Sequence, residues 1–300
     1  MLDKLEYMIA LAREQHFGRA AESCGVAQPT FSLGIQNLEQ SLGVVLVKRS
    51  SRFQGFTPEG ERLLGWARRL VGDAKAMRHD MMGLKSDIDG NLRIAAVPFV
   101  MPLVARLTVP LQMRHPNIRL TVLGRTSDVL LNMLQQREIE AGITYLSNEP
   151  IGEVDAVPLY REEYFLLTTP TGPLGDATSV QWSEIANAPL CLFARELQHR
   201  RIVDSVLRRV GVEVAPVMET DSMPALIAHV RLGRWASIVP SSALESIDLA
   251  GGELRALPLV EPHVTHTIGL VVSNRYQVAP AVEVLIAEAR AQSQHLLPAA

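Results

Sequence analysis

Apolar residues recur with a helical period between residues 17 and 46. They form a small face and then a stripe with steps of four, three and four: Phe17, Ala20, Ala21 and Cys24, followed by Phe31, Ile35, Leu38 and Leu42. Gly25 and Val26 interrupt this period. The pattern therefore predicts two short helices joined by a tight turn, the second ending before Gly43.

The second predicted helix carries short hydrogen-bonding groups opposite its apolar stripe. These positions are Thr30, Gln36, Asn37 and Gln40, with Ser32 and Leu33 at the edges. Amides and hydroxyls on a helix that is anchored by its other side can meet base edges in a DNA major groove. The alternative is a polar face that only meets water, and the segments that follow favour DNA.

A hairpin is predicted directly after this helix. An apolar run at residues 44–47 and a second short segment at 53–56 flank a basic, serine-rich turn. Lys48, Arg49 and Arg52 are the natural phosphate contacts of such a wing, and the alternative is a solvated basic loop. Basic and acidic residues are nearly balanced over residues 1–57, so any DNA affinity depends on where the charges sit.

A long helix with a heptad pattern is predicted next. Thr57 can cap it, Pro58 suits its first turn, and Glu59 and Glu61 match the helix dipole. Its apolar positions alternate steps of four and three: Leu63, Ala67, Leu70, Ala74, Met77, Met81, Leu84 and Ile88. The expected partner is the same helix of a second copy, and the alternative is packing on its own domain.

Residues 91–300 alternate short apolar runs with amphipathic stretches. Strands are expected at 92–97, 118–123, 141–145, 164–168, 190–193, 214–219, 236–239 and 267–272, and helices at 102–114, 127–136, 201–210 and 224–232. Buried strands alternating with helices predict an α/β fold with parallel-rich sheets. Pro110 falls inside a predicted helix and is expected to kink or end it.

Composition is that of a globular protein. The chain has 300 residues, 47% of them hydrophobic, and a formal net charge of −3. No apolar run approaches a membrane span, and residues 1–15 form an amphipathic helix, with Leu5, Met8, Ile9 and Ala12 on its buried side, rather than a secretory signal. We therefore expect a cytoplasmic protein.

The two cysteines, Cys24 and Cys191, fall in different predicted domains and are not expected to pair or to form a redox sensor.

Signatures of catalysis are missing from the sequence. It has no G-x-G-x-x-G, P-loop or G-x-S-x-G motif, and its eight histidines are scattered. His263 and His266 are three apart, which in a strand means opposite faces, and no cysteine or acidic cluster completes a metal site. An α/β enzyme stays as one alternative. A solute-binding protein without a DNA role is the other, but it leaves the first ninety residues unexplained.

Several motifs together identify the chain as similar to LysR-type transcriptional regulators over its whole length. They are the pair Ala20-Ala21, Gln28-Pro29 with Ser32, Leu38-Glu39, Leu42-Gly43, Arg49 before the wing, and Thr57 with Gly60. Two positions depart from the family pattern. Gly18 stands where a hydroxyl residue is usual before the second helix, which weakens the expected cap. Leu33 stands where Arg or another polar residue is common, which puts one DNA contact in doubt.

The resemblance implies a three-part organisation. Residues 1–57 are expected to form an all-α winged helix-turn-helix domain and residues 58–90 a linker and dimerisation helix. Residues 91–300 are expected to form a two-lobed domain like that of periplasmic binding proteins, with lobe I at 91–161 and 267–300 and lobe II at 162–266. The implied DNA contacts are Arg19, Gln28, Pro29, Thr30, Ser32, Leu33, Gln36, Lys48, Arg49 and Arg52.

The implied partners are double-stranded DNA, a small-molecule effector and further copies of the chain in a dimer or homotetramer. Contact with RNA polymerase stays open, as does action as activator or repressor. No cofactor other than the effector, no metal, no catalytic residue and no membrane partner is expected. The stretches RSSRFQGFTPEGE, NEP and HVRLGRWAS also resemble a subgroup encoded beside formate dehydrogenase genes.

The effector is expected in the cleft between the lobes, at strand ends and helix starts, where backbone N–H groups favour anions. The candidates are Phe99, Val100, Met101, Thr126, Ser127, Thr144, Tyr145, Gln198, His199, Asp221 and Ser222. In the resemblance, Ser127, Tyr145 and His199 fall near effector-contact positions. The alternative for each residue singly is a helix cap or a packed ring.

Two further features bear on the effector. The loop at residues 99–101 is apolar, which favours a small, partly apolar or weakly bound ligand. His199, Arg200 and Arg201 form a basic cluster beside Arg195, which could recognise a carboxylate or could be solvated charge on one helix. Asp204 is placed to pair with Arg200 at a spacing of four.

Overall fold

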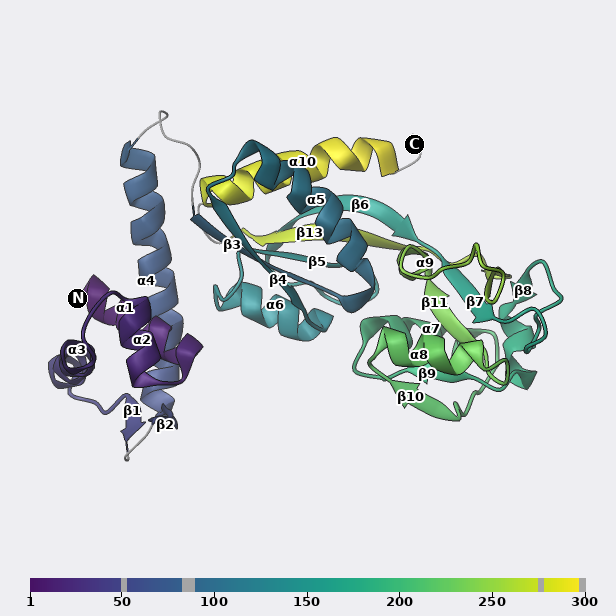
Figure 1. Ribbon diagram of the computed structural model, residues 1–300, viewed down its shortest axis with the longest axis horizontal. Coiled ribbons are helices and arrows are strands. Elements are labelled where there is room, and N and C mark those ends of the chain that lie inside the picture. The colour runs from purple at the N-terminus through teal and green to yellow at the C-terminus, as the bar shows by residue number, and fades with distance from the viewer. Residues whose placement is uncertain (50–52, 83–89, 275–277, 297–300) are drawn as a thin grey trace. The chain divides into compact units, whose positions relative to one another are not determined.

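The computed structural model describes residues 1–49, 53–82, 90–274 and 278–296 and contains two compact units (Figure 1). The N-terminal unit holds α1 (Leu2–Glu14), α2 (Phe17–Ser23), α3 (Gln28–Leu42), β1 (Val47–Arg49), β2 (Phe53–Phe56) and α4 (Pro58–Met82). In the described ranges, none of the helices combines the length and the apolar character that crossing a bilayer needs.

The C-terminal unit is divided into two lobes. Lobe I contains β3 (Gly90–Ala96), η1 (Pro98–Val100), α5 (Met101–Arg114), β4 (Ile118–Gly124), α6 (Ser127–Gln135), β5 (Ala141–Tyr145), β6 (Val154–Glu162), β13 (His266–Ser273) and α10 (Pro280–Leu296). Lobe II contains β7 (Tyr164–Thr168), β8 (Val180–Gln181), η2 (Trp182–Asn187), β9 (Cys191–Phe193), α7 (Gln198–Arg209), β10 (Met218–Thr220), α8 (Met223–Arg231), β11 (Ser237–Pro240), α9 (Ser241–Leu244) and β12 (Arg255–Val260).

The predicted helix pair is present, but its cap differs from the expectation. Gly18 does not precede α2, because the helix begins at Phe17. The cap is the His16 ring, whose Nδ1 accepts from the backbone N–H groups of Gly18 and Arg19 at 3.1 and 3.4 Å. A Cβ atom at Gly18 would stand 3.2 Å from this ring. The missing hydroxyl is therefore replaced by His16, and a larger residue at position 18 would crowd that cap.

Helix α3 is anchored by its apolar stripe as predicted, except at its last turn. Phe31, Ile35 and Leu38 are buried, whereas Leu42 is 42% exposed. The helix ends at Gly43, which takes φ 69°, a left-handed conformation that glycine adopts without strain. Leu42 therefore lies in the terminal turn, beyond the reach of the core that covers the preceding turns.

The predicted hairpin and long helix are also present. β1 pairs antiparallel with β2, while Val44 and Val45 are exposed and precede the strand. The Thr57 Oγ1 accepts from the Gly60 N–H at 3.0 Å and so caps α4. Helix α4 is described over Pro58–Met82, and Leu84 and Ile88 of the heptad pattern lie outside the described residues.

Helix α4 has two apolar faces rather than one. Leu64, Ala67 and Val71 are buried in the core of the N-terminal unit, where α4 packs on α1. Ala67, expected in the intermolecular seam, therefore belongs to the internal face. Leu63 of the expected seam also packs against this core, whereas Leu70 is 46% and Met77 is 61% exposed.

The sheets are mixed rather than parallel-rich. The lobe I sheet has the order β4-β3-β5-β13-β6, with β3 parallel to β4 and β5, and β13 antiparallel to β5 and β6. Figure 1 shows α5 and α10 on one side of it and α6 on the other. The lobe II sheet has the order β11-β7-β12-β8, and β9 pairs in parallel with β10. Antiparallel strands enter because the chain passes between the lobes at β6–β7 and at β12–β13.

Some elements were not predicted from the sequence. They are β6, β8, β12, α9, α10 and η2, and the expected strand at 214–219 is mostly irregular, with only the end of that range in β10. Pro110 does not break α5, contrary to the expectation. The Arg106 carbonyl oxygen, which a residue with an N–H at position 110 would bond, accepts from Gln292 Nε2 at 2.7 Å. Helix α10 thus replaces the missing hydrogen bond.

Candidate functional site

The exposed face of α3 carries the side chains that the sequence assigned to DNA. Gln28, Pro29, Thr30, Leu33 and Gln36 are exposed, and Ser32 is half-buried. The opposite face is fixed by ring packing, since the Phe31 ring stacks on Tyr7 with centroids 4.7 Å apart. A Cβ at Gly34 would come within 2.7 Å of the Tyr7 ring, so only glycine allows this close approach. The groove face is therefore presented on a rigidly packed helix.

Two of the predicted phosphate contacts, Arg19 and Lys48, are exposed on α2 and β1. Arg19 donates through Nη2 to the Glu14 carbonyl oxygen at 2.7 Å. The side chain of Arg49 and the whole of Arg52 lie outside what the structure describes. Because these cations belong to separate elements, their positions rather than the net charge of the domain determine where it can contact phosphates.

A buried chain of hydrogen bonds joins the two lobes at the predicted cleft. Ser127 begins α6, Thr144 is in β5 and Gln198 begins α7. The Thr144 Oγ1 donates to the Ser127 Oγ at 3.1 Å, and the Ser127 Oγ donates to the Gln198 Oε1. All three side chains are buried. The structure therefore brings together three of the predicted effector residues, and they satisfy one another.

His199 lies next to this chain and is uncharged. Its Nε2 is 3.0 Å from the Ile238 carbonyl oxygen, which can only accept, so Nε2 carries the proton. The Nδ1 atom is buried without a hydrogen-bond partner among the described residues. Burial lowers the pKa of His199 to about 4, and the nearby charge of Arg200 lowers it further. His199 thus offers a neutral acceptor inside the domain.

The apolar loop before α5 does not offer a ligand site in this conformation. Phe99 and Val100 are buried in η1, while Met101 and Thr126 are half-buried. The Phe99 ring packs with Phe193 at 4.5 Å, inside a core cluster whose other members belong to lobe II. The side chains of Phe99 and Val100 are therefore part of the packed interior, and their predicted contact with an effector stays a prediction.

Buried polar groups lie at the two chain crossings and at nearby Tyr145, and of these only Tyr145 was expected to contact an effector. Glu162 is fully buried and accepts from the Ser241 and Ser242 hydroxyls, the Ser242 N–H and the Tyr160 hydroxyl. The Tyr164 hydroxyl lies 2.9 Å from His266 Nδ1. The Tyr145 hydroxyl is buried without a hydrogen-bond partner among the described residues, and burial raises its pKa well above the usual value. Tyr145 is thus a neutral hydroxyl, with Tyr164 close enough to contribute to its raised pKa.

The basic cluster of α7 is neutralised internally. Arg200 is buried and pairs with Asp204 at 2.8 Å, as predicted, and with Glu219. Arg201 binds Glu149 at 2.7 Å and Asp128 at 3.4 Å, both in lobe I. Neither expectation for these two arginines is correct, because they are neither free to bind an effector nor merely solvated.

The last two predicted effector residues lie at the start of α8. Asp221 is exposed, and the half-buried Ser222 accepts from the Ala225 N–H at 3.4 Å as the helix cap. Ser222 therefore has the structural role that was left open as the alternative.

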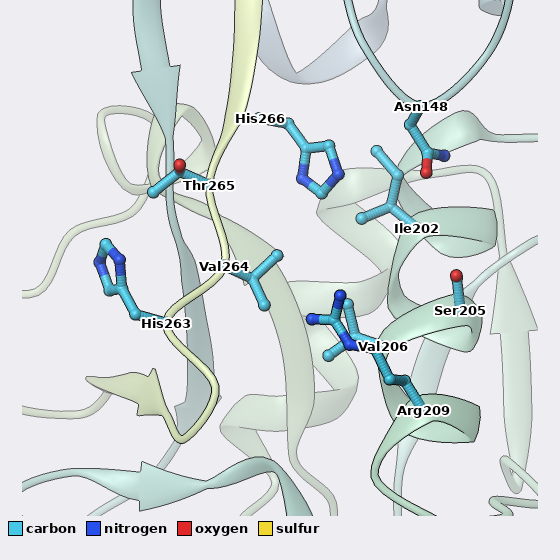
Figure 2. Close-up of a pocket in the computed structure, with 9 residues that line it drawn as sticks. All are labelled: Asn148, Ile202, Ser205, Val206, Arg209, His263, Val264, Thr265 and His266. Carbon is cyan, nitrogen blue, oxygen red and sulfur yellow. The ribbon is translucent and has the colours of Figure 1, made fainter.

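A pocket of about 260 Å³ lies between α7 and the segment that enters β13 (Figure 2). It is lined by Asn148, Ile202, Ser205, Val206, Arg209, His263, Val264, Thr265 and His266. None of these residues was predicted as a site. Figure 2 shows the His263 and His266 rings on opposite sides of their segment, with His266 and Val264 facing α7. The α7 residues share one helix face, with spacings of three, four and seven from Ile202, which was the available sequence signal.

Both parts of the chain match family models. Residues 2–61 match the bacterial regulatory helix-turn-helix protein of the lysR family, and residues 85–294 match the LysR substrate binding domain. The chain is 25% identical over 297 residues to the uncharacterised regulator YfeR of Shigella flexneri, covering 99% of this chain and 95% of that protein. It is 28% identical over 268 residues to the transcriptional dual regulator OxyR of Escherichia coli, covering 89% of this chain and 87% of that protein.

Solved structures agree with these matches. A full-length OxyR variant from Pseudomonas aeruginosa superposes with a TM-score of 0.80 at 28% identity and covers 97% of both chains. A full-length CbnR in complex with its target DNA superposes with a TM-score of 0.67 at 21% identity, covers 97% of this chain and 99% of that chain, and supports the fold alone.

Proposed function

This chain belongs to the LysR family of DNA-binding transcriptional regulators, and from that premise we propose how its parts divide the work. Residues 1–57 bind DNA, residues 58–90 link and dimerise, and residues 91–300 hold a small-molecule effector. The observation that carries the proposal is α3, whose buried Phe31, Ile35 and Leu38 hold an exposed row of amide and hydroxyl groups outward. Such a helix reads a major groove.

DNA recognition is divided between sequence reading and positioning. Gln28, Thr30, Ser32, Leu33 and Gln36 face the bases, with Pro29 shaping the start of α3. Arg19, Lys48, Arg49 and Arg52 contact phosphates, which fixes the register without reading sequence. Because Leu33 cannot donate a hydrogen bond, the base opposite it is read by apolar contact or not at all.

Self-association uses α4. Trp66, Leu70 and Met77 are exposed on the face beside the one that packs on α1, and a seam of this kind matches the same helix of a second copy. Two-fold pairing presents two α3 helices to an inverted repeat in DNA. We propose that two dimers assemble further into a tetramer that bends DNA, and that the regulator contacts RNA polymerase when it activates.

We also propose that the protein is located in the cytoplasm alongside that DNA and that it has no enzymatic activity.

The effector is proposed to bind between the lobes, near Ser127, Thr144, Gln198 and His199. Ser127, Thr144 and Gln198 hydrogen-bond to one another, so an effector that binds there must replace some of these hydrogen bonds. The buried His199 Nδ1 and Tyr145 hydroxyl offer it an acceptor and a donor. An effector changes DNA binding only if its affinity differs between the two arrangements of the lobes.

Peroxide sensing, which the names of several relatives describe, is not proposed here. Cys191 is buried in β9 and its thiol is 3.7 Å from the Ala236 carbonyl oxygen. Cys24 lies in the other unit. We instead propose, from the resemblance of three stretches of sequence, that the chain belongs to the subgroup encoded beside formate dehydrogenase genes.

A gel-shift assay tests the DNA-binding role. The full-length chain is expected to shift the upstream region of its own gene more strongly than random DNA, with affinity falling as salt rises. Gln28→Ala should reduce the preference for the specific site, by roughly tenfold for one lost base contact. Lys48→Ala should weaken binding to both DNAs evenly and lower the salt slope by about one.

Two results would contradict the proposal. A wild-type chain without sequence preference would remove the regulator role. Equal behaviour of Gln28→Ala and Lys48→Ala on specific and random DNA would remove the division between base reading and phosphate contact.

A further inference from the structure

We propose that the pocket between α7 and residues 263–266 binds the carboxylate of a small organic acid, held by the Arg209 guanidinium and the His266 imidazole. This pocket shares no residue with the effector residues expected at the helix starts. The inference rests on the proposed function only in treating the C-terminal unit as the ligand-binding one.

The charge of Arg209 is the first support. Arg200 and Arg201 on the same helix are each paired with two carboxylates, whereas Arg209 has no acidic partner among the residues that the structure describes. Figure 2 shows its guanidinium directed into the pocket, toward Val264 and His266. A guanidinium that faces a cavity without a carboxylate presents a planar set of donors that matches a carboxylate in a bidentate geometry.

His266 supplies a second donor. Its Nδ1 lies 2.9 Å from the Tyr164 hydroxyl. When the phenol donates to Nδ1, the neutral ring carries its proton on Nε2 and can give that hydrogen bond to an anion. Burial and the nearby Arg209 charge lower the pKa of His266, so at neutral pH Arg209 carries a positive charge and His266 does not. One carboxylate is enough to balance it.

The rest of the lining defines the class of ligand. Asn148, Ser205 and Thr265 supply neutral hydrogen-bonding groups, while Ile202, Val206 and Val264 are apolar. The acids nearest in sequence bind other groups, since Glu149 pairs with Arg201, Asp204 with Arg200, and Glu261 accepts from Gln181. Glu163 lies 3.3 Å from His263, at the side of the pocket away from Arg209 in Figure 2. A volume of about 260 Å³ is at the lower end of ligand pockets. A carboxylate with a short aliphatic body fits these features better than a sugar phosphate.

The pocket is connected to the proposed effector cleft through one side chain. The Tyr164 ring stacks on His199, with centroids 5.6 Å apart and an interplanar angle of 23°, while its hydroxyl contacts His266. Asn148 comes from the lobe I loop after β5, whereas Arg209 comes from lobe II. An anion held by both would bridge the lobes and would be sensed by the Tyr164–His199 pair.

Calorimetric titration of the purified full-length chain tests this site. The probes are butyrate, the neutral isostere butyramide, and inorganic phosphate. Butyrate should bind and raise the melting temperature, and butyramide should not. Arg209→Gln should weaken butyrate binding at least tenfold. The matched control is Arg208→Gln, because Arg208 is the adjacent exposed arginine of α7 and does not line the pocket; this variant should bind butyrate as the wild type does.

The outcomes separate the site from the proposed function. Butyrate binding that is unchanged in Arg209→Gln, or absent from the wild type, overturns the carboxylate pocket while leaving gel shifts unaffected. Binding of phosphate in preference to butyrate overturns the assignment of the ligand class. Loss of sequence-selective gel shifts in the wild type overturns the DNA role but not the calorimetric result.

Discussion

Cys191 and His199 lie eight positions apart in lobe II, and burial changes the chemistry of both. The pKa of the Cys191 thiol is raised to about 11 because β9 removes it from water. Burial moves the pKa of His199 in the opposite direction, since it disfavours the charged form in each case. At neutral pH both groups are therefore uncharged, and the interior between the lobes acts through hydrogen bonds rather than through charge.

Cys191 should consequently be inert in the native protein. A pKa near 11 leaves a thiolate fraction of roughly one in ten thousand at pH 7, and the thiolate is the reacting form. In a Cys24→Ala variant, a disulfide reagent should label Cys191 only after unfolding, and the native rate should rise with pH toward 11. Labelling of folded protein at the rate of a free cysteine would contradict this, as would a gel shift altered by peroxide.

Among single residues, the sequence identified polar side chains that lie between the lobes, but it did not identify what they bond to. Ser127, Thr144, Gln198 and His199 do meet between the lobes. Their partners could not be predicted, because each contact joins segments that are distant in the chain, such as Ser127 and Gln198. Arg209 was missed because an isolated arginine on an amphipathic helix gives no signal until its neighbours are known to be paired.

Among the elements, strands with continuous apolar runs were predicted well, whereas the edge strand β6 was missed. β5 is buried throughout and has the predicted bounds. β6 pairs with β13 at the edge of its sheet, carries exposed residues along its length and contains Pro158. Its register shifts opposite Ile268 and Gly269, so the proline sits at an irregularity where its missing N–H is tolerated. Such a strand has the composition of a loop.

The contact between α5 and α10 gives a prediction at this scale. Gln292→Ala removes the donor that bonds the Arg106 carbonyl oxygen and should lower the free energy of unfolding by about 1 kcal/mol. In a Pro110→Ala background the helix can satisfy that oxygen itself, so the same change should cost less. Urea denaturation of the wild type, both single variants and the double variant measures the coupling, expected at roughly 0.5–1 kcal/mol. Strict additivity would show that Gln292 does not compensate for Pro110.

At the scale of the whole molecule, the proposed DNA binding and effector binding belong to two different units, and each unit has its own hydrophobic core. The apolar residues of α1–α4 form one buried cluster, and Phe99 joins lobe I to the lobe II cluster. We propose that a ligand between the lobes acts on DNA binding through the arrangement of several copies of the chain. The face of α4 that this arrangement needs was recognisable from its heptad spacing. The face of α4 that packs inside the N-terminal unit was not recognised, because Leu64 and Val71 lie on a stripe close to the heptad positions.

Met77 provides the test of that arrangement. Its side chain is 61% exposed on α4, on the face shared with Trp66 and Leu70, so replacement should not disturb the buried Leu64, Ala67 and Val71. Met77→Asp places like charges opposite each other across a two-fold helix pair and should convert the dimer to a monomer in sedimentation. Met77→Leu keeps the seam apolar and should sediment as the wild type. Because one subunit contacts only one half-site, Met77→Asp should also lose most affinity for an inverted repeat while binding a single half-site unchanged. A Met77→Asp protein that still sediments as a dimer would place the subunit contact elsewhere than on this face of α4.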